Sequence, residues 1–144
     1  MSALSQPADV AALADQLSAA ADAIHARVLA DLAARAGAPV PDADQAAMRA
    51  LFDAEVLLRQ RANGLYADAA AAVVKALAIP QQQLMALTSQ ASDKIRTITR
   101  ISDALSLSGA LLTVAGAAVT GQLPAIVTAV DQLRRTVLVV QAHG

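Results

Sequence analysis

The stretch ALSLSGALLTVAGAAVTGQLPAIVTAV, residues 104–130, decides the fold, and it contains no charged residue. Successive residues of an α-helix are rotated by about 100° around its axis. A helix that is apolar on every side must be enclosed by other helices, by a partner chain or by lipid. The stretch therefore predicts a helical hairpin that is either buried or facing a membrane.

The segment before this stretch has the spacing of an amphipathic helix. Apolar residues recur every three or four positions over residues 84–105, and the charged residues fall on the opposite side: Asp93, Arg96, Arg100 and Asp103. If the same helix continues, Leu107, Leu111 and Val114 occupy the side that held these charges. We therefore expect a single helix over residues 81–120 whose outer side changes from exposed to buried at Asp103.

The composition indicates an all-α protein with one domain. Hydrophobic residues make up 56% of the chain, and many of them are alanine, the strongest helix former. Aromatic residues make up 1%, whereas sheets favour aromatic and β-branched residues. A chain of 144 residues is long enough for one hydrophobic core. We expect a single helical domain spanning residues 1–144.

Helix boundaries in the first half predict two long helices. Pro7 is typical of a first helical turn and Gly37 of a helix end, with an apolar stripe from Val10 to Leu32 between them. Asp42 and Gln45 have the spacing of a capping box, in which the two side chains cap the start of the second helix. We expect this helix to run to about residue 78. The pair at 63–64, Asn-Gly, is either a turn or a weak point, and the unbroken apolar period favours one helix.

The second half predicts two more helices, 81–120 and 124–141. Pro80 suits the start of the third helix, and Gly121 to Pro124 form the turn before the last. The resulting architecture is an elongated bundle of about four helices, arranged as two helical hairpins with a hydrophobic C-terminal hairpin.

Small residues recur every fourth position in the central stretch: Gly109, Thr113, Ala117 and Gly121. This spacing puts them near one side of a helix, where small side chains let another helix approach closely. Together with Leu107, Leu111 and Val114, they are our candidate helix-packing or membrane-facing residues.

The sequence lacks the residues that most catalytic and metal sites need. There is no cysteine, and Glu55 is the single glutamate, so the carboxylate and histidine set of a di-iron bundle is missing. His25 is expected on the helix surface and His143 in a frayed C-terminal tail. Glu55 is either a buried acid with a raised pKa or a residue that extends to the stripe edge or pairs with Arg59. We expect no enzymatic activity, no cofactor and no metal site.

Charge argues against nucleic-acid binding. The net charge is −1 and the isoelectric point is about 6.0, so there is no general basic field. The charge is uneven: residues 1–44 carry two basic and six acidic residues (net −4), and residues 45–144 carry nine and six (net +3). This leaves two interpretations, ordinary solvated surfaces or electrostatic pairing of the N-terminal helix with the later helices.

Two functional hypotheses follow. The first is a non-catalytic helical interaction protein, such as a scaffold, adaptor or small binding subunit, that forms a homo-oligomer or binds a protein partner. The alternative is a membrane-active protein that inserts residues 104–130 into lipid, but charges at 131, 134 and 135 are costly inside a bilayer. The first residues do not resemble a signal peptide. We expect a cytoplasmic location, with membrane association under the alternative.

Overall fold

The computed structural model describes residues 2–35 and 37–143, and within these ranges the chain is helical apart from turns and connections. It forms five α-helices and one short 3-10 helix, η1. Their bounds are α1 (Pro7–Arg35), α2 (Asp42–Ala67), η1 (Ala69–Ala72), α3 (Gln81–Thr97), α4 (Ile101–Thr120) and α5 (Leu123–His143). The predicted all-α class is confirmed, whereas the predicted count of about four helices is not, since the described residues form five α-helices.

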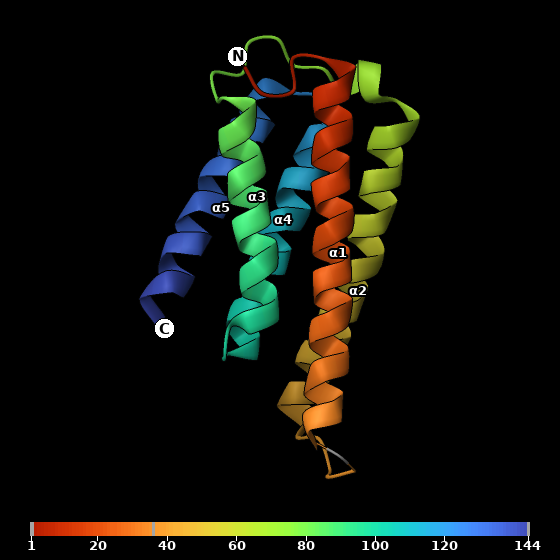
Figure 1. The fold of residues 1–144 in the computed structure, drawn as a ribbon, viewed down its shortest axis with the longest axis vertical. Helices are drawn as coiled ribbons and strands as arrows, with labels where there is room; N and C mark the ends of the chain where they lie inside the picture. Colours follow the sequence, from red (N-terminus) through yellow and green to blue (C-terminus); the bar gives the residue numbers. More distant parts are fainter. Residues whose placement is uncertain (1, 36, 144) are drawn as a thin grey trace.

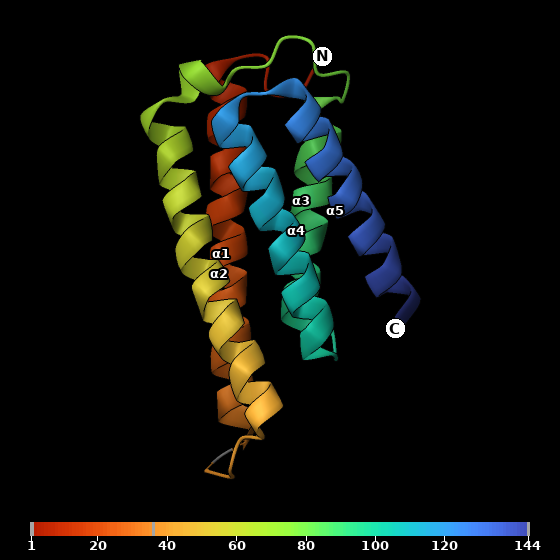
Figure 2. The same ribbon diagram turned by 180° about the vertical axis from the view of Figure 1, so that it is seen from behind.

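The helices form an elongated bundle with one helix on its outside (Figures 1 and 2). α1 packs against α2 and α3, and α4 packs mainly against α2 and α5. α5 contacts α4 and α3 but neither α1 nor α2. All five helices contribute side chains to one hydrophobic core. Two hairpins therefore do not describe the layout, because α3, α4 and α5 follow one another antiparallel.

The hairpin of α1 and α2 extends beyond the lower ends of the other helices (Figure 1). Near this end, Leu29 is 54% exposed and Leu32 is 48% exposed, whereas Leu13 and Leu17, nearer the start of α1, are fully buried. The apolar stripe of the first helix was predicted to be buried as far as Leu32. Its end is exposed because α1 is longer than the helices that cover it.

The predicted helix over residues 81–120 is broken. α3 ends at Thr97, residues 98–100 are not helical, and α4 begins at Ile101. Ile98 and Arg100 both have extended backbone angles. The break falls in a run rich in β-branched residues (IRTITRI, residues 95–101), which have low helix propensity. The extrapolation of one helical face across Asp103 was therefore wrong, and Asp103 itself is buried.

The second helix ends earlier than predicted. α2 continues through Gly64, as expected, but stops at Ala67, and residues 73–80 cross the end of the bundle to reach α3. The backbone N–H of Val74 donates to the carbonyl oxygen of Leu4 at 2.8 Å, which ties this crossing to the N-terminal segment. The predicted capping box is also absent. Asp42 makes no capping hydrogen bond, and Gln45 donates instead to the carbonyl oxygen of Val40.

The turn between α4 and α5 requires glycine. Gly121 has a φ of +66°, and a Cβ built on it would lie 3.2 Å from the carbonyl oxygen of Ala71. Both the left-handed backbone and the close approach of η1 disfavour any side chain. The last helix begins two residues later, near the predicted position. Its predicted apolar face is buried: Ile126, Val130, Leu133, Val137 and Val140.

Candidate functional site

The candidate packing residues of α4 divide between two sides of the helix. Leu107 and Leu111 are fully buried and Val114 is 2% exposed, so other helices of the same chain enclose them. Gly109 and Thr113 are exposed, whereas Ala117 is buried and Gly121 lies in the turn. The four-residue spacing therefore does not stay on one surface, because the helical repeat is 3.6 residues.

A different set of small residues covers the exposed side of α4, and we call it the small face. Its members are spaced by four and three residues in turn, and all are exposed except Gly116, which is half-buried: Ser102, Ser106, Gly109, Thr113, Gly116 and Thr120. Beside it run Leu105, Leu112 and Val119, which are partly or fully exposed. In Figure 2 α4 faces the viewer between α2 and α5.

The small face is uncharged, and the hydroxyl groups of Ser106, Thr113 and Thr120 are hydrogen-bonded within α4. Ser106 and Thr113 each donate a 3.0 Å hydrogen bond to the carbonyl oxygen four residues earlier in α4. Such bonds leave a serine or threonine without need of a further partner. An apolar surface can therefore cover these three hydroxyl groups without leaving them unpaired.

The two glycines of the small face are unexplained by packing within the chain. A Cβ added to Gly109 or Gly116 would meet nothing within 4 Å. A glycine inside a helix costs about 1 kcal/mol relative to alanine. Glycine therefore lowers the stability of α4 at two positions where the neighbouring helices leave room for a larger residue.

α4 also has the length and apolarity of a membrane-spanning helix. It is the one helix within residues 2–35 and 37–143 that meets this description, with a mean hydropathy of 1.4 over its window. Half of that window is buried inside the bundle. Core helices of soluble proteins share these properties, so the observation weakly permits membrane association and carries no further weight.

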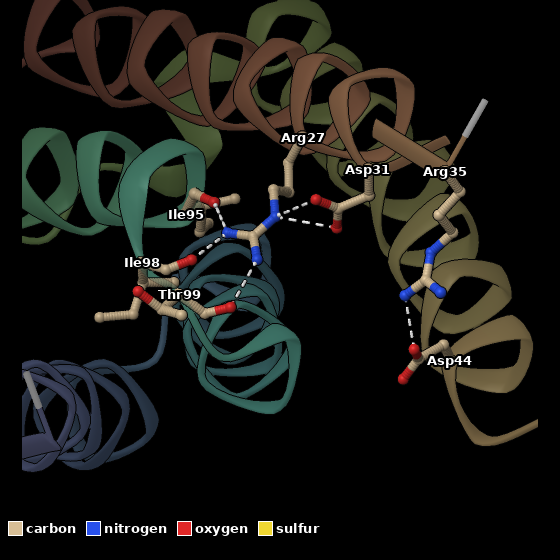
Figure 3. Close-up of polar contacts among 7 residues, drawn as sticks. All are labelled: Arg27, Asp31, Arg35, Asp44, Ile95, Ile98 and Thr99. Atoms are coloured by element: carbon tan, nitrogen blue, oxygen red, sulfur yellow. Dashed lines mark hydrogen bonds and ion pairs between the residues drawn. The ribbon is translucent and has the colours of Figure 1, made fainter. Parts of the chain in front are cut away.

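A buried arginine holds the break between α3 and α4 (Figure 3). Arg27 of α1 is 7% exposed, and its Nη1 donates to the carbonyl oxygens of Ile95, at 3.0 Å, and Ile98. Its Nη2 donates to the carbonyl oxygen of Thr99 at 3.3 Å, and its Nε pairs with Asp31 at 2.9 Å. These carbonyls lie at the end of a helix, where they have no partner within the helix. Arg27 therefore caps α3 from a neighbouring helix.

A buried carboxylate and a histidine join α4 to the end of α5. Nδ1 of His143 lies 3.0 Å from both carboxylate oxygens of Asp103. The Asp103 side chain is 7% exposed and that of His143 is 36% exposed. The expectation that His143 lies in a frayed tail is wrong, because α5 extends to this residue and the contact anchors its end.

The other histidine belongs to a network across α1 and α2. Nδ1 of His25 lies 3.0 Å from Glu55, and Arg59 pairs with Glu55 at 3.0 Å and with Asp22 at 2.9 Å. The hydrogen bond to Glu55, followed by that to Asp22, raises the pKa of Arg59 above its usual value. Glu55 is buried, and it pairs with Arg59 as one of the two alternatives predicted. Asp22–Arg59 is also an electrostatic pair between the N-terminal helix and a later one.

The polar groups do not assemble a metal or catalytic centre in the described part of the chain. No three histidine or carboxylate side chains there are placed to hold one metal ion. The roles of Arg27, Asp103 and His143 were not predicted from the sequence. Arg27 did carry a signal, since it lies between Ile24 and Val28 on the buried stripe, where a charge needs a partner. The pairing of Asp103 with His143 joins residues 40 apart and has no local signal.

Comparisons with known proteins give no further guide to function: no family model, no curated protein and no solved structure matches this chain.

Proposed function

We propose that this chain is a non-catalytic helical interaction protein that self-associates through the small face of α4. The observation that carries the proposal is the pair of glycines, Gly109 and Gly116, on an exposed helical side where nothing within the chain lies near them. Small residues at this spacing let two helix backbones approach closely. A second helix on this face would give the glycines a packing role.

A second copy of the chain suits this face better than a charged partner does. The small face carries no charge, so two copies can meet without like-charge repulsion. A two-fold axis places the same patch of each protomer against the other, which is the commonest symmetry of homo-oligomers. Leu105, Leu112 and Val119 would then add apolar area beside the close helix contact.

The experiment compares association with stability in one variant. Gly109→Gln/Gly116→Gln introduces two good helix formers where space within the chain is free. We expect the unfolding free energy of the monomer to rise by about 1–2 kcal/mol, while the longer side chains hold two α4 helices apart. Sedimentation velocity over a range of protein concentrations should show association for the parent and a monomer for the variant.

Gly64 supplies the matched control. It lies in α2, is exposed, and also has nothing within 4 Å of an added Cβ. Gly64→Gln should raise the stability by about half as much, since it replaces one glycine instead of two, and should leave association unchanged. Association that persists in Gly109→Gln/Gly116→Gln would rule out the small face as the contact, and a parent protein that is monomeric at every concentration would rule out self-association itself.

Membrane insertion of residues 104–130 is the second candidate, favoured by the mean hydropathy of α4. Insertion would require the α4–α5 hairpin to leave the bundle, exposing the pockets that now hold Leu107 and Leu111. Flotation with lipid vesicles separates the two functions. Self-association predicts that the protein stays at the bottom of the gradient, whereas co-flotation that resists high salt would favour insertion.

A further inference from the structure

A cavity of about 470 Å³ opens beside the contact between Asp103 and His143. It lies where the end of α3, the break at residues 98–100, the start of α4 and the end of α5 meet. Its size falls within the range of small-ligand sites. It is separate from the small face, apart from their common position at the start of α4.

The charges that line this cavity are mainly positive. Lys94 and Arg100 contribute two cations and Asp103 one carboxylate, giving +1 with His143 neutral and +2 with His143 protonated. His143 engages both oxygens of Asp103. Neither Lys94 nor Arg100 forms an ion pair with any residue in the described ranges. Two cations thus face the cavity without a counter-ion.

The remaining lining has the mixed character of a site for an organic ligand. Thr97, Thr99 and Gln141 supply hydroxyl and amide groups, and Ile98 and Val140 supply apolar surface. Ligand sites typically combine apolar walls with a few polar groups that fix orientation.

We propose that this cavity binds a small organic anion whose head is a phosphate monoester or a carboxylate. Lys94 and Arg100 bind the anionic head, since charge-assisted hydrogen bonds to such groups are the strong ones. Ile98 and Val140 contact the apolar part. Asp103 is a positioning residue, because it holds the ring of His143 at the edge of the cavity.

Calorimetric titration with phenyl phosphate tests the proposal on the full chain. We expect saturable binding in the parent, with Lys94→Gln and Arg100→Gln each about tenfold weaker, as the loss of one charged hydrogen bond implies. Phenol, which lacks the anionic head, should not bind.

Arg96→Gln is the matched control, because Arg96 is exposed on α3 near Lys94 but does not line the cavity. It should change the affinity by less than about twofold. No saturable binding, or equal weakening by Arg96→Gln, would overturn the proposal. Vesicles with and without anionic phospholipid distinguish the source of the head group: binding to anionic vesicles that phenyl phosphate displaces would identify a lipid head, whereas phenyl phosphate binding alone would identify a soluble anion.

Discussion

At the scale of single residues, the buried polar side chains make hydrogen bonds where a helix breaks or ends. Arg27 satisfies the carbonyls at the end of α3, and His143 and Asp103 fasten the end of α5 to the start of α4. Buried polar groups are costly unless they are paired. Their pairing therefore fixes where the helices end as well as how they pack.

Replacing Arg27 should be far more damaging than replacing the other ion-paired arginine of α1. Arg27→Met keeps an apolar stem but leaves Asp31 and the carbonyls of α3 without their donor, and we expect a loss of roughly 2–4 kcal/mol in unfolding free energy. Arg35→Met is the control, because Arg35 and its partner Asp44 are about 30% exposed, and it should cost within about 1 kcal/mol. Urea unfolding at fixed protein concentration measures both. Equal losses would contradict the capping role of Arg27.

Tyr66 is the single tyrosine, so its ionisation can be followed by absorbance near 295 nm. Its hydroxyl donates to Asp15, and this hydrogen bond, followed by burial, raises the pKa of Tyr66 above 10.0. Asp15→Asn should lower that pKa towards its usual value. Asp22→Asn, which removes an acid from the same helix without touching Tyr66, should leave it unchanged.

The sign of the pH effect on stability follows from the same shift. The folded state holds the Tyr66 proton more tightly than the unfolded state does, so this contribution is present below about pH 10 and is lost as the pH rises through the folded pKa. Stability should therefore fall less steeply above pH 10 in Asp15→Asn than in the parent. An unchanged slope would contradict the hydrogen bond as the cause.

At the scale of the element, α4 has two sides in different environments, one buried and one exposed. One packs into the core through Leu107 and Leu111, and the other presents the small face to solvent. Its apolar composition was read from the sequence as burial on every side. The structure instead leaves about half of the helix uncovered, and that half combines the small face with the flanking side chains of Leu105, Leu112 and Val119.

Replacing a buried leucine and an exposed leucine by alanine should lower the unfolding free energy by very different amounts. Leu107→Ala removes a fully buried side chain and should cost roughly 2–5 kcal/mol. Leu138→Ala, on α5, removes a leucine that is 59% exposed and should cost within about 0.5 kcal/mol. Urea unfolding at one protein concentration compares them, since association would alter the apparent stability. Similar costs would mean that α4 is not seated in the core in solution.

At the scale of the whole molecule, the helices are not held equally. α1 packs against both α2 and α3, whereas α5 rests on α4 and α3 from outside the bundle. Elements with fewer partners open at a lower free-energy cost than the core does. α5 is therefore the helix best placed to move without unfolding the remainder.

Amide hydrogen exchange measured by NMR should show that α5 opens more readily than α1. Amides in α5 should exchange faster than those in the middle of α1. His143→Ala should accelerate α5 further, because it removes the contact with Asp103 at the helix end. His25→Ala is the control, since His25 pairs with Glu55 between α1 and α2 and should leave α5 unaffected. Equal protection of α5 and α1 would show that α5 opens together with the rest of the bundle.

The sequence by itself determined the helical class and the positions of the first and last helices. These features follow from local propensity and from the spacing of apolar residues, both of which are properties of nearby positions in the chain. Gly37 and Gly121 likewise marked turns that the structure confirms, and both have positive φ.

Only the tertiary structure decided the break after α3, the early end of α2 and the burial of Asp103. Each depends on a group that is distant in the sequence. Arg27 donates hydrogen bonds to carbonyl oxygens at the end of α3, 68 residues or more away, and the N–H of Val74 donates to the carbonyl oxygen of Leu4. The same holds for the candidate sites, since the exposed side of α4 depends on where α2 and α5 lie. Periodicity gives the faces of a helix, but the neighbours that cover each face are set by packing between elements.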